Sequence, residues 1–234
     1  MTVKDLEEAA LIIQQHGAHR PTERRFLMFV DIHTHIDNQS VIKIVSENFE
    51  EKVLLTEGVH PWEVGGDLEE VPRDLRSLGM TAIAIGEVGL DKAHKETFER
   101  QVEVFEEMIR ISETLRKPVI VHCVRAYSEI IEMRKKTKAT MTWVMHGFNS
   151  SVETMRQLLK YDIYISLGDI LYRNENQAVK ILKDIPIERL FLETDVSGRD
   201  IRDVYEKAAS LMGCEVEFLC NKIFENYGRL EAAH

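Results

Sequence analysis

The chain has 234 residues and a formal net charge of −10, because 30 Lys and Arg stand against 40 Asp and Glu. Its 44% hydrophobic and 30% charged residues are ordinary globular composition and exclude a disordered chain. The acidic balance argues against a coat for nucleic acid or anionic lipid, and no apolar run approaches the roughly 20 residues of a membrane span. Three widely spaced cysteines exclude a disulfide scaffold and favour a cytoplasmic setting.

Short β-branched runs alternate with amphipathic stretches along most of the chain. The runs predict strands, because each is bounded by polar residues, Gly or Pro. Eight such strands are expected, at residues 28–33, 41–45, 53–56, 81–86, 118–122, 141–146, 162–167 and 189–193. Helical apolar spacing predicts helices at residues 67–78, 94–116, 126–136, 152–159, 175–182 and 200–227, the last broken near Gly213.

This alternation predicts an α/β fold, a (β/α)₈ TIM-type barrel that forms one domain over residues 1–234. The connections at 36–40 and 46–52 are too short for a parallel crossover, which needs a dozen or more residues. We therefore predict that the second strand runs antiparallel between the first and third, in a distorted barrel with missing early helices. An amphipathic helix at 3–16, in an N-terminal extension of residues 1–25, is expected to cover the exposed side.

The strongest chemical signal is a pair of histidines at the end of the first strand. His33 and His35 are two residues apart, so their side chains point to the same face of a strand and can bind one metal ion. The alternative is that they are two polar residues in a turn. Asp31 precedes them on the same predicted face and is expected to hydrogen-bond a ligand imidazole.

Other strand ends carry residues of the same kind. Glu87 follows the predicted strand 81–86, His122 and His146 close two later strands, and Asp195 follows the last one. Each could be structural by itself, since a histidine at a strand end commonly bonds a neighbouring loop. In a (β/α)₈ barrel the carboxyl ends of the strands meet at one mouth, where active sites are built. Together these residues therefore predict a metal centre.

The ligand set constrains the metal and the chemistry. Four imidazoles and two carboxylates are too many for one tetrahedral ion and suit two divalent ions that share a bridging carboxylate. Zn²⁺, Mn²⁺ or Ni²⁺ is favoured over Ca²⁺, and Mg²⁺ is compatible with the set. Two such ions lower the pKa of bound water and polarise a carbonyl or phosphoryl oxygen, so the expected chemistry is metal-assisted hydrolysis.

The order of the motifs along the chain resembles that of the TatD-type deoxyribonucleases, metal-dependent hydrolases among the amidohydrolase-like barrels. The motifs are Asp31-Ile-His33-Thr-His35, Gly58-Val-His60-Pro61, Ile85-Gly-Glu87-Val-Gly89-Leu-Asp91, His122, His146-Gly-Phe148-Asn-Ser150 and Glu193-Thr-Asp195. The glutamate motif and the Glu-Thr-Asp triplet are specific, whereas the leading His-x-His is shared with many hydrolases. The motifs span residues 31–195, so the resemblance covers most of the chain.

The resemblance implies metal ligands at His33, His35, Glu87, His122, His146 and Asp195. The first two histidines would bind one ion, the other two would bind the second, and Glu87 would bridge them. Asp195 would bind metal and also accept a proton from the attacking water, so Glu87 and Asp195 are the catalytic carboxylates of this interpretation.

Three features depart from the family pattern. Val124 stands where the family commonly has Arg, which leaves Arg125, one residue later, as the candidate for binding a substrate phosphate. Val196 replaces the proline that commonly follows Glu-Thr-Asp, and the segment between His35 and Val53 is shorter than usual. These differences leave the predicted metal ligands intact and concern the wall of the pocket.

Two residues of the third-strand loop are further candidates for contacting substrate. His60 either contacts substrate or orders the loop beside Pro61, and Trp62 either stacks on a nucleobase or packs under the loop. Asp91 and His94 are candidates for orienting the metal ligands from behind.

The leading hypothesis is a metal-dependent phosphodiesterase, by resemblance a deoxyribonuclease of the exonuclease type. Its expected substrate is a small phosphoester or the end of single-stranded DNA, without extended duplex binding or membrane partners, in a monomer or an undetermined oligomer. An amide, lactone or other ester hydrolase on the same barrel is one alternative, and a metal-binding scaffold without turnover is another. A phosphoesterase that closes with Asp-x-His is disfavoured, because Asp195 is followed by Val196 and Ser197.

Overall fold

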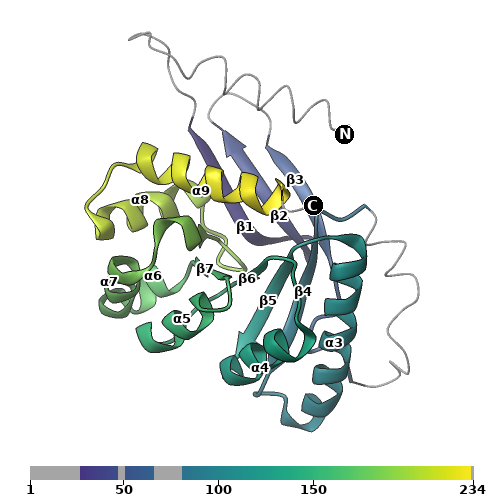
Figure 1. The fold of residues 1–234 in the computed structure, drawn as a ribbon. Helices are drawn as coiled ribbons and strands as arrows, with labels where there is room; N and C mark the ends of the chain where they lie inside the picture. The colour runs from purple at the N-terminus through teal and green to yellow at the C-terminus, as the bar shows by residue number, and fades with distance from the viewer. Residues whose placement is uncertain (1–26, 47–50, 66–80, 233–234) are drawn as a thin grey trace.

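In the computed structural model, which describes residues 27–46, 51–65 and 81–232, eight strands follow one another around a single sheet in sequence order (Figure 1). Helices cover the outside of the parallel part, as the predicted (β/α)₈ class requires. The strands are β1 (Met28–Ile36), β2 (Gln39–Ser46), β3 (Lys52–Glu57), β4 (Ala84–Asp91), β5 (Val119–Val124), β6 (Trp143–Met145), β7 (Ile163–Leu167) and β8 (Leu190–Leu192).

The first three strands form an antiparallel meander, which confirms the prediction from the short connections. Asp37 and Asn38 join β1 to β2 with φ angles of 48° and 65°, the left-handed conformation that a two-residue hairpin turn uses. β2 pairs antiparallel with β3 as well, whereas every pair from β3 to β8 is parallel. The barrel is therefore distorted on the side where β1 and β2 lie.

The described helices agree with the expected periodicity, apart from small shifts at their ends. They are α3 (Phe98–Leu115) after a 3₁₀ turn (Lys95–Thr97), α4 (Tyr127–Thr137), α5 (Val152–Leu159), α6 (Ile170–Arg173), α7 (Glu175–Asp184), a second 3₁₀ turn (Ile187–Arg189), α8 (Ile201–Met212) and α9 (Val216–Ala232). Gly213, at φ 68°, separates α8 from α9 as predicted. The short α6 was not predicted, and the helices expected at 3–16 and 67–78 lie outside the described residues.

The predicted boundary of the fourth strand is wrong. The strand does not end at Gly86 but continues to Asp91, so Glu87 lies inside β4. The two glycines look like strand breakers in the sequence, yet each allows β4 to approach β5 closely. A Cβ at Gly86 would lie 2.6 Å from Ile120 Cβ, and one at Gly89 would lie 2.0 Å from the carbonyl oxygen of His122.

Two contacts hold β1 in place at the open side of the barrel. The hydroxyl of Tyr205, from α8, bonds both the N–H and the carbonyl of Val30, each at 3.0 Å. Nearer the mouth, Thr34 forms a parallel bridge with Asp195 beyond the end of β8. The eight-stranded barrel is thus nearly closed, and its last link lies at the residues predicted to carry the chemistry.

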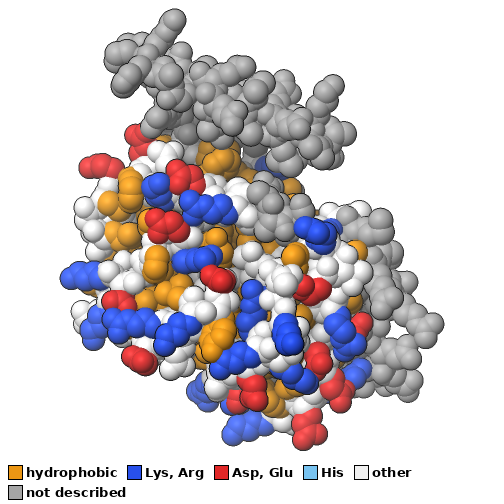
Figure 2. Space-filling view, viewed as in Figure 1, with side chains coloured by type: hydrophobic (Ala, Val, Ile, Leu, Met, Phe, Trp, Pro, Cys, Tyr) orange, Lys and Arg blue, Asp and Glu red, His pale blue; other side chains and the backbone are white. Residues whose placement is uncertain are grey.

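The outer surface carries charges of both signs. On the face drawn in Figure 2, Lys and Arg side chains lie among Asp and Glu side chains. Several are paired, for example Arg156 with Asp184 at 2.6 Å and Lys207 with Glu175 at 2.6 Å. Among the described helices, none is long and apolar enough to cross a membrane.

Candidate metal centre

The bulge in β1 decides which way its polar residues face. The pairing of β1 with β2 shifts register between Asp31 and Thr34, which re-aims the side chains on either side of the shift. The carboxylate of Asp31 consequently accepts hydrogen bonds from Thr194 N at 2.9 Å and Thr194 Oγ1 at 2.6 Å. The prediction that Asp31 hydrogen-bonds a ligand imidazole is therefore wrong.

Glu87, from β4, lies at the centre of the site with 7% of its side chain exposed. Its Oε2 lies 3.2 Å from His33 Nε2 and 3.5 Å from His35 Nε2. Its Oε1 lies 2.5 Å from His122 Nδ1 and 2.7 Å from His146 Nε2. A single carboxylate thus separates four imidazoles into two pairs, one from the antiparallel β1 and one from parallel strands.

Asp195 reaches the same site through the link between β1 and β8. The backbone N–H of Asp195 donates to the carbonyl of His33 at 3.0 Å, and the carbonyl of Asp195 accepts from Thr34 Oγ1 at 3.2 Å. Its Oδ1 then lies 3.6 Å from His33 Nε2 and 3.5 Å from His35 Nε2. With 36% of its side chain exposed, Asp195 is the carboxylate of this site that solvent reaches.

The buried ionisable groups of the site strongly shift one another's pKa values. Burial acts to raise the pKa of Glu87, but the surrounding imidazoles, His146 foremost, outweigh it and hold that pKa well below its usual range. Burial acts to lower the pKa of His146, yet the charge of Glu87 outweighs it and raises that pKa to about 9. Burial and the neighbouring His146 lower the pKa of His33 to about 4. Glu87 is therefore ionised at neutral pH and lies among imidazole rings, and carboxylate and imidazole are the two kinds of ligand that a divalent cation would use here.

Unpartnered nitrogen atoms support that interpretation. Three buried nitrogen atoms make no hydrogen bond of regular geometry within the described part of the chain: His33 Nε2, His122 Nε2 and His146 Nδ1. A buried polar atom without a hydrogen-bond partner costs free energy unless it binds another group, such as an ion. Among the described residues, groups of ligand atoms from His33, Glu87 and His146, and from His33, His35 and Asp195, each lie within 4.8 Å of one another. The residues present fit divalent metal ions.

The remaining candidates from the sequence occupy different places. His60 lies against the centre, with Nε2 3.3 Å from Glu87 Oε1, and Trp62 beside it is 62% exposed. Asp91 Oδ2 lies 3.6 Å from His122 Nε2, whereas His94 lies beside the Trp62 ring at 5.6 Å and not behind a predicted ligand. Arg125 follows β5 and is exposed, at φ 56°.

Two groups that lie beside the histidines had no role in the sequence-based prediction, although Glu193 belongs to the Glu193-Thr-Asp195 motif. Ser40 Oγ, from β2, lies 3.3 Å from His33 Nδ1 and also accepts from Thr56 Oγ1 at 2.7 Å. Glu193 is buried near His146, with Oε1 3.9 Å from its Nδ1, and burial raises the pKa of Glu193 to about 7. Only the register of the β1–β2 hairpin places Ser40 there, and no motif signals it.

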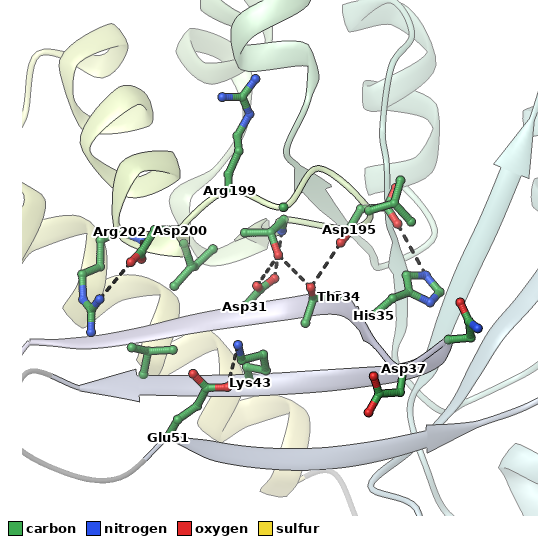
Figure 3. A pocket seen from close by; sticks show the side chains of 16 residues that line it. Asp31, Thr34, His35, Asp37, Lys43, Glu51, Asp195, Arg199, Asp200 and Arg202 are labelled. Atoms are coloured by element: carbon green, nitrogen blue, oxygen red, sulfur yellow. Dashed lines mark hydrogen bonds and ion pairs between the residues drawn. The ribbon is translucent and has the colours of Figure 1, made fainter.

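A hollow of about 850 Å³ adjoins the centre on the side of β1 and β2. Figure 3 shows Asp31 and Thr34 of β1 turned toward the loop that carries Asp195. His35 and Asp195 line the hollow where it meets the centre. Its volume is that of a small-molecule site, and Asp195 is part of its wall.

A near-closed α/β barrel whose mouth gathers histidines around a shared carboxylate defines the class of metal-dependent hydrolases. The chain belongs to the TatD family: residues 15–231 match the family described as TatD related DNase. It is 34% identical over 198 residues to the uncharacterized metal-dependent hydrolase YcfH of Escherichia coli K12, covering 77% of this chain and 74% of that protein. It is also 34% identical over 120 residues to the human 3′-5′ RNA nuclease TATDN2, covering 49% of this chain and 16% of that protein.

Solved structures share the fold. The crystal structure of YJJV, a TatD homologue from Escherichia coli K12, matches with a TM-score of 0.66 and 20% identity over 75% of each chain. A TatD family hydrolase from Entamoeba histolytica matches with a TM-score of 0.65 and 21% identity, over 76% of this chain and 74% of that one. The family match and the curated relative, together with this shared fold, identify the protein as a metal-dependent hydrolase of the TatD family.

Proposed function

We propose that the protein is a two-ion phosphodiesterase that removes nucleotides from the end of a nucleic acid strand. One observation carries the two-ion part: the oxygens of Glu87 face two separate pairs of imidazoles, at 2.5–3.5 Å. A carboxylate in that position suits a bridge between two cations. The imidazole-rich set favours Zn²⁺, with Mn²⁺ or Mg²⁺ as alternatives.

The ligands of the proposed ions follow from the same division. His33, His35 and Asp195 would hold the ion on the Oε2 side of Glu87, and the two histidines of the parallel strands would hold the other. When bound, two such ions lower the pKa of water and stabilise negative charge on a phosphoryl oxygen. Glu87, almost fully buried, fixes the arrangement by its charge.

Asp195 is the residue that we assign to proton transfer. It is the more exposed of the two carboxylates and lines the hollow beside the centre, from which we expect water to reach it. Its Oδ1 lies within 3.6 Å of both β1 imidazoles, so it can accept the proton of the attacking water at the edge of the centre. Its left-handed backbone, at φ 48°, is held by the hydrogen bond to the carbonyl of His33.

The family and the charge of the chain support the choice of substrate. The family is described as related to deoxyribonucleases, and the human relative is a 3′-5′ RNA nuclease. A net charge of −10 and the mixed charges of the outer surface favour a short footprint of few phosphate contacts over an extended duplex. Arg125, exposed at the end of β5, is the candidate for contacting a phosphate beyond the scissile one.

The experiment is a substrate panel with metal-stripped protein reloaded with Zn²⁺, Mn²⁺ or Mg²⁺. Single-stranded DNA, single-stranded RNA, a chromogenic phosphodiester, a lactone and an amide are each assayed for hydrolysis. We expect metal-dependent release of nucleotides and loss of at least about 100-fold in kcat/KM in both Glu87→Gln and Asp195→Asn. Asp184→Asn, a surface carboxylate on α7, is the control. Hydrolysis of the lactone or amide alone would overturn the proposal.

A further inference from the structure

The loop after β3 places an exposed aromatic ring beside the metal centre. The ring of Trp62 stands nearly perpendicular to that of His60, with centroids 4.8 Å apart at 85°. The Trp62 ring also makes an angle of 75° with the ring of His122, at a centroid distance of 6.2 Å. With 62% of the residue exposed, Trp62 does not pack under the loop. A large aromatic surface therefore faces solvent next to a proposed metal ligand.

Hydrogen bonds fix that ring from behind. The indole N–H of Trp62 donates to Asp91 Oδ2 at 2.7 Å, and Asp91 is only 2% exposed. The other carboxylate oxygen accepts from Ala93 N at 2.7 Å, and the backbone N–H of Asp91 donates to Gln101 Oε1 at 2.7 Å. A ligand that stacks on Trp62 therefore meets a ring whose orientation is already set, which lowers the entropic cost of binding.

The same loop determines the hydrogen position on His60. The backbone N–H of Trp62 donates to His60 Nδ1 at 3.2 Å, so Nδ1 carries a lone pair and the hydrogen of the neutral ring is on Nε2. That nitrogen lies 3.3 Å from Glu87 Oε1 and 3.4 Å from His122 Nδ1. A nitrogen that carries a hydrogen cannot bind a metal ion. Distances alone group His60 with Glu87 and His122 as possible ligands, but its tautomer makes it a hydrogen-bond donor.

We propose that His60 and Trp62 form a nucleotide-binding element within the active site. His60 Nε2–H donates to a phosphoryl oxygen of the substrate, and the Trp62 ring stacks on the nucleobase of the same nucleotide. This inference rests on the proposed phosphodiesterase function and assigns the two side chains that would bind the nucleotide to be released. Stacking tolerates every base, so the element selects for a nucleotide without reading its sequence.

Two esters with the same leaving group separate this inference from the proposed function. Thymidine 5′-(p-nitrophenyl phosphate) and methyl p-nitrophenyl phosphate share the scissile bond and differ in the nucleoside. Base stacking is worth about 1–3 kcal/mol, so Trp62→Ala should lower the ratio of their kcat/KM values by roughly 5- to 140-fold. Trp62→Phe should keep most of the ratio. Phe218→Ala, which truncates an exposed aromatic residue on α9, is the matched control.

The outcomes distinguish the two claims. If the wild type hydrolyses both esters and Trp62→Ala leaves the ratio unchanged, the stacking role is wrong and the phosphodiesterase stands. If the wild type hydrolyses neither ester, the proposed function is wrong, and the inference is then tested by nucleotide binding alone. Of the two tryptophans Trp143 is fully buried, so saturable quenching of emission by thymidine 5′-monophosphate reports on Trp62. Quenching absent from the wild type, or retained in Trp62→Phe, would overturn the inference.

Metal content tests the role of His60. After dialysis against excess Zn²⁺ and removal of free metal, His60→Ala should retain as many ions per chain as the wild type, whereas His122→Ala should lose metal. The expected cost of His60→Ala is a higher KM for the thymidine ester. Metal loss in His60→Ala equal to that in His122→Ala would show that His60 is a ligand and would overturn its role as a donor.

Discussion

The hydroxyl of Tyr205 offers a test of how β1, the strand that carries the first two histidines, is held in the barrel. Tyr205→Phe removes one oxygen that both accepts from Val30 N and donates to Val30 O, at 3.0 Å in each case. Tyr205 and Val30 are both fully buried, so water does not replace the lost partner. The backbone of β1 is left with an unpaired donor and an unpaired acceptor.

The cost follows from those two groups. A buried polar group without a partner costs about 1–3 kcal/mol, so the variant should lose at least about 2 kcal/mol of unfolding free energy. For a chain of this length that corresponds to a fall in Tm of roughly 4–8 °C. The packing of Tyr205 against Phe29, with ring centroids 5.1 Å apart, is retained by the phenylalanine ring.

A matched variant controls for removal of a hydroxyl. Tyr172 Oη is buried and has no hydrogen-bond partner among the residues that the structure describes. Tyr172→Phe should therefore change the unfolding free energy by less than about 0.5 kcal/mol or stabilise the protein. Urea denaturation followed by circular dichroism gives both values. Equal effects of the two substitutions, or a loss below about 0.5 kcal/mol for Tyr205→Phe, would refute the hydrogen-bond argument.

Two further predictions concern Gly89 and Asp31. In Gly89→Ala the new Cβ would lie 2.0 Å from the carbonyl oxygen of His122, at a backbone φ of 151°, so the unfolding free energy from urea denaturation should fall by roughly 3 kcal/mol or more. The control is Gly228→Ala on α9, where the Cβ enters open space and should raise the unfolding free energy by about 1 kcal/mol. Burial raises the pKa of Asp31 from 3.8 to about 7, so between those values the unfolded chain binds fewer protons and the stability of the metal-free protein falls as pH rises. Asp31→Asn should remove that part of the decline between pH 4 and 7, and an unchanged pH dependence would contradict the assignment.

The fold was predictable where chain geometry leaves few choices. The connections at 36–40 and 46–52 cannot cross a sheet, so β2 had to run antiparallel, as observed. The repeat of apolar residues likewise predicted α3, and Gly213 predicted the break before α9. The end of β4 was not predictable in this way, because its glycines act through the neighbouring strand and not through local preference.

In the site too, features that follow from local sequence pattern were predictable, and features set by tertiary contacts were not. The mouth of the barrel brings Glu87, from within β4, and Asp195, from the loop after β8, together with the histidines, as the positions of these residues in the predicted strands indicated. The orientation of Asp31 depends on the bulge in β1, and the placement of the Trp62 ring depends on its hydrogen bond to Asp91 at the end of β4. Neither feature has a local signal in the sequence. The prediction therefore left open whether Trp62 stacks on a base or packs under the loop, and it gave Asp31 an imidazole as partner instead of Thr194.

The proposed function depends most directly on Glu87 lying between two metal ions when the site is loaded. Anomalous diffraction from a crystal grown with Zn²⁺ locates bound ions directly and independently of the substrate. We expect two peaks, one between Glu87 Oε2 and the β1 histidines with Asp195, and one between Glu87 Oε1 and the pair His122 and His146. A single peak on one side of Glu87, or none at this carboxylate, would contradict it.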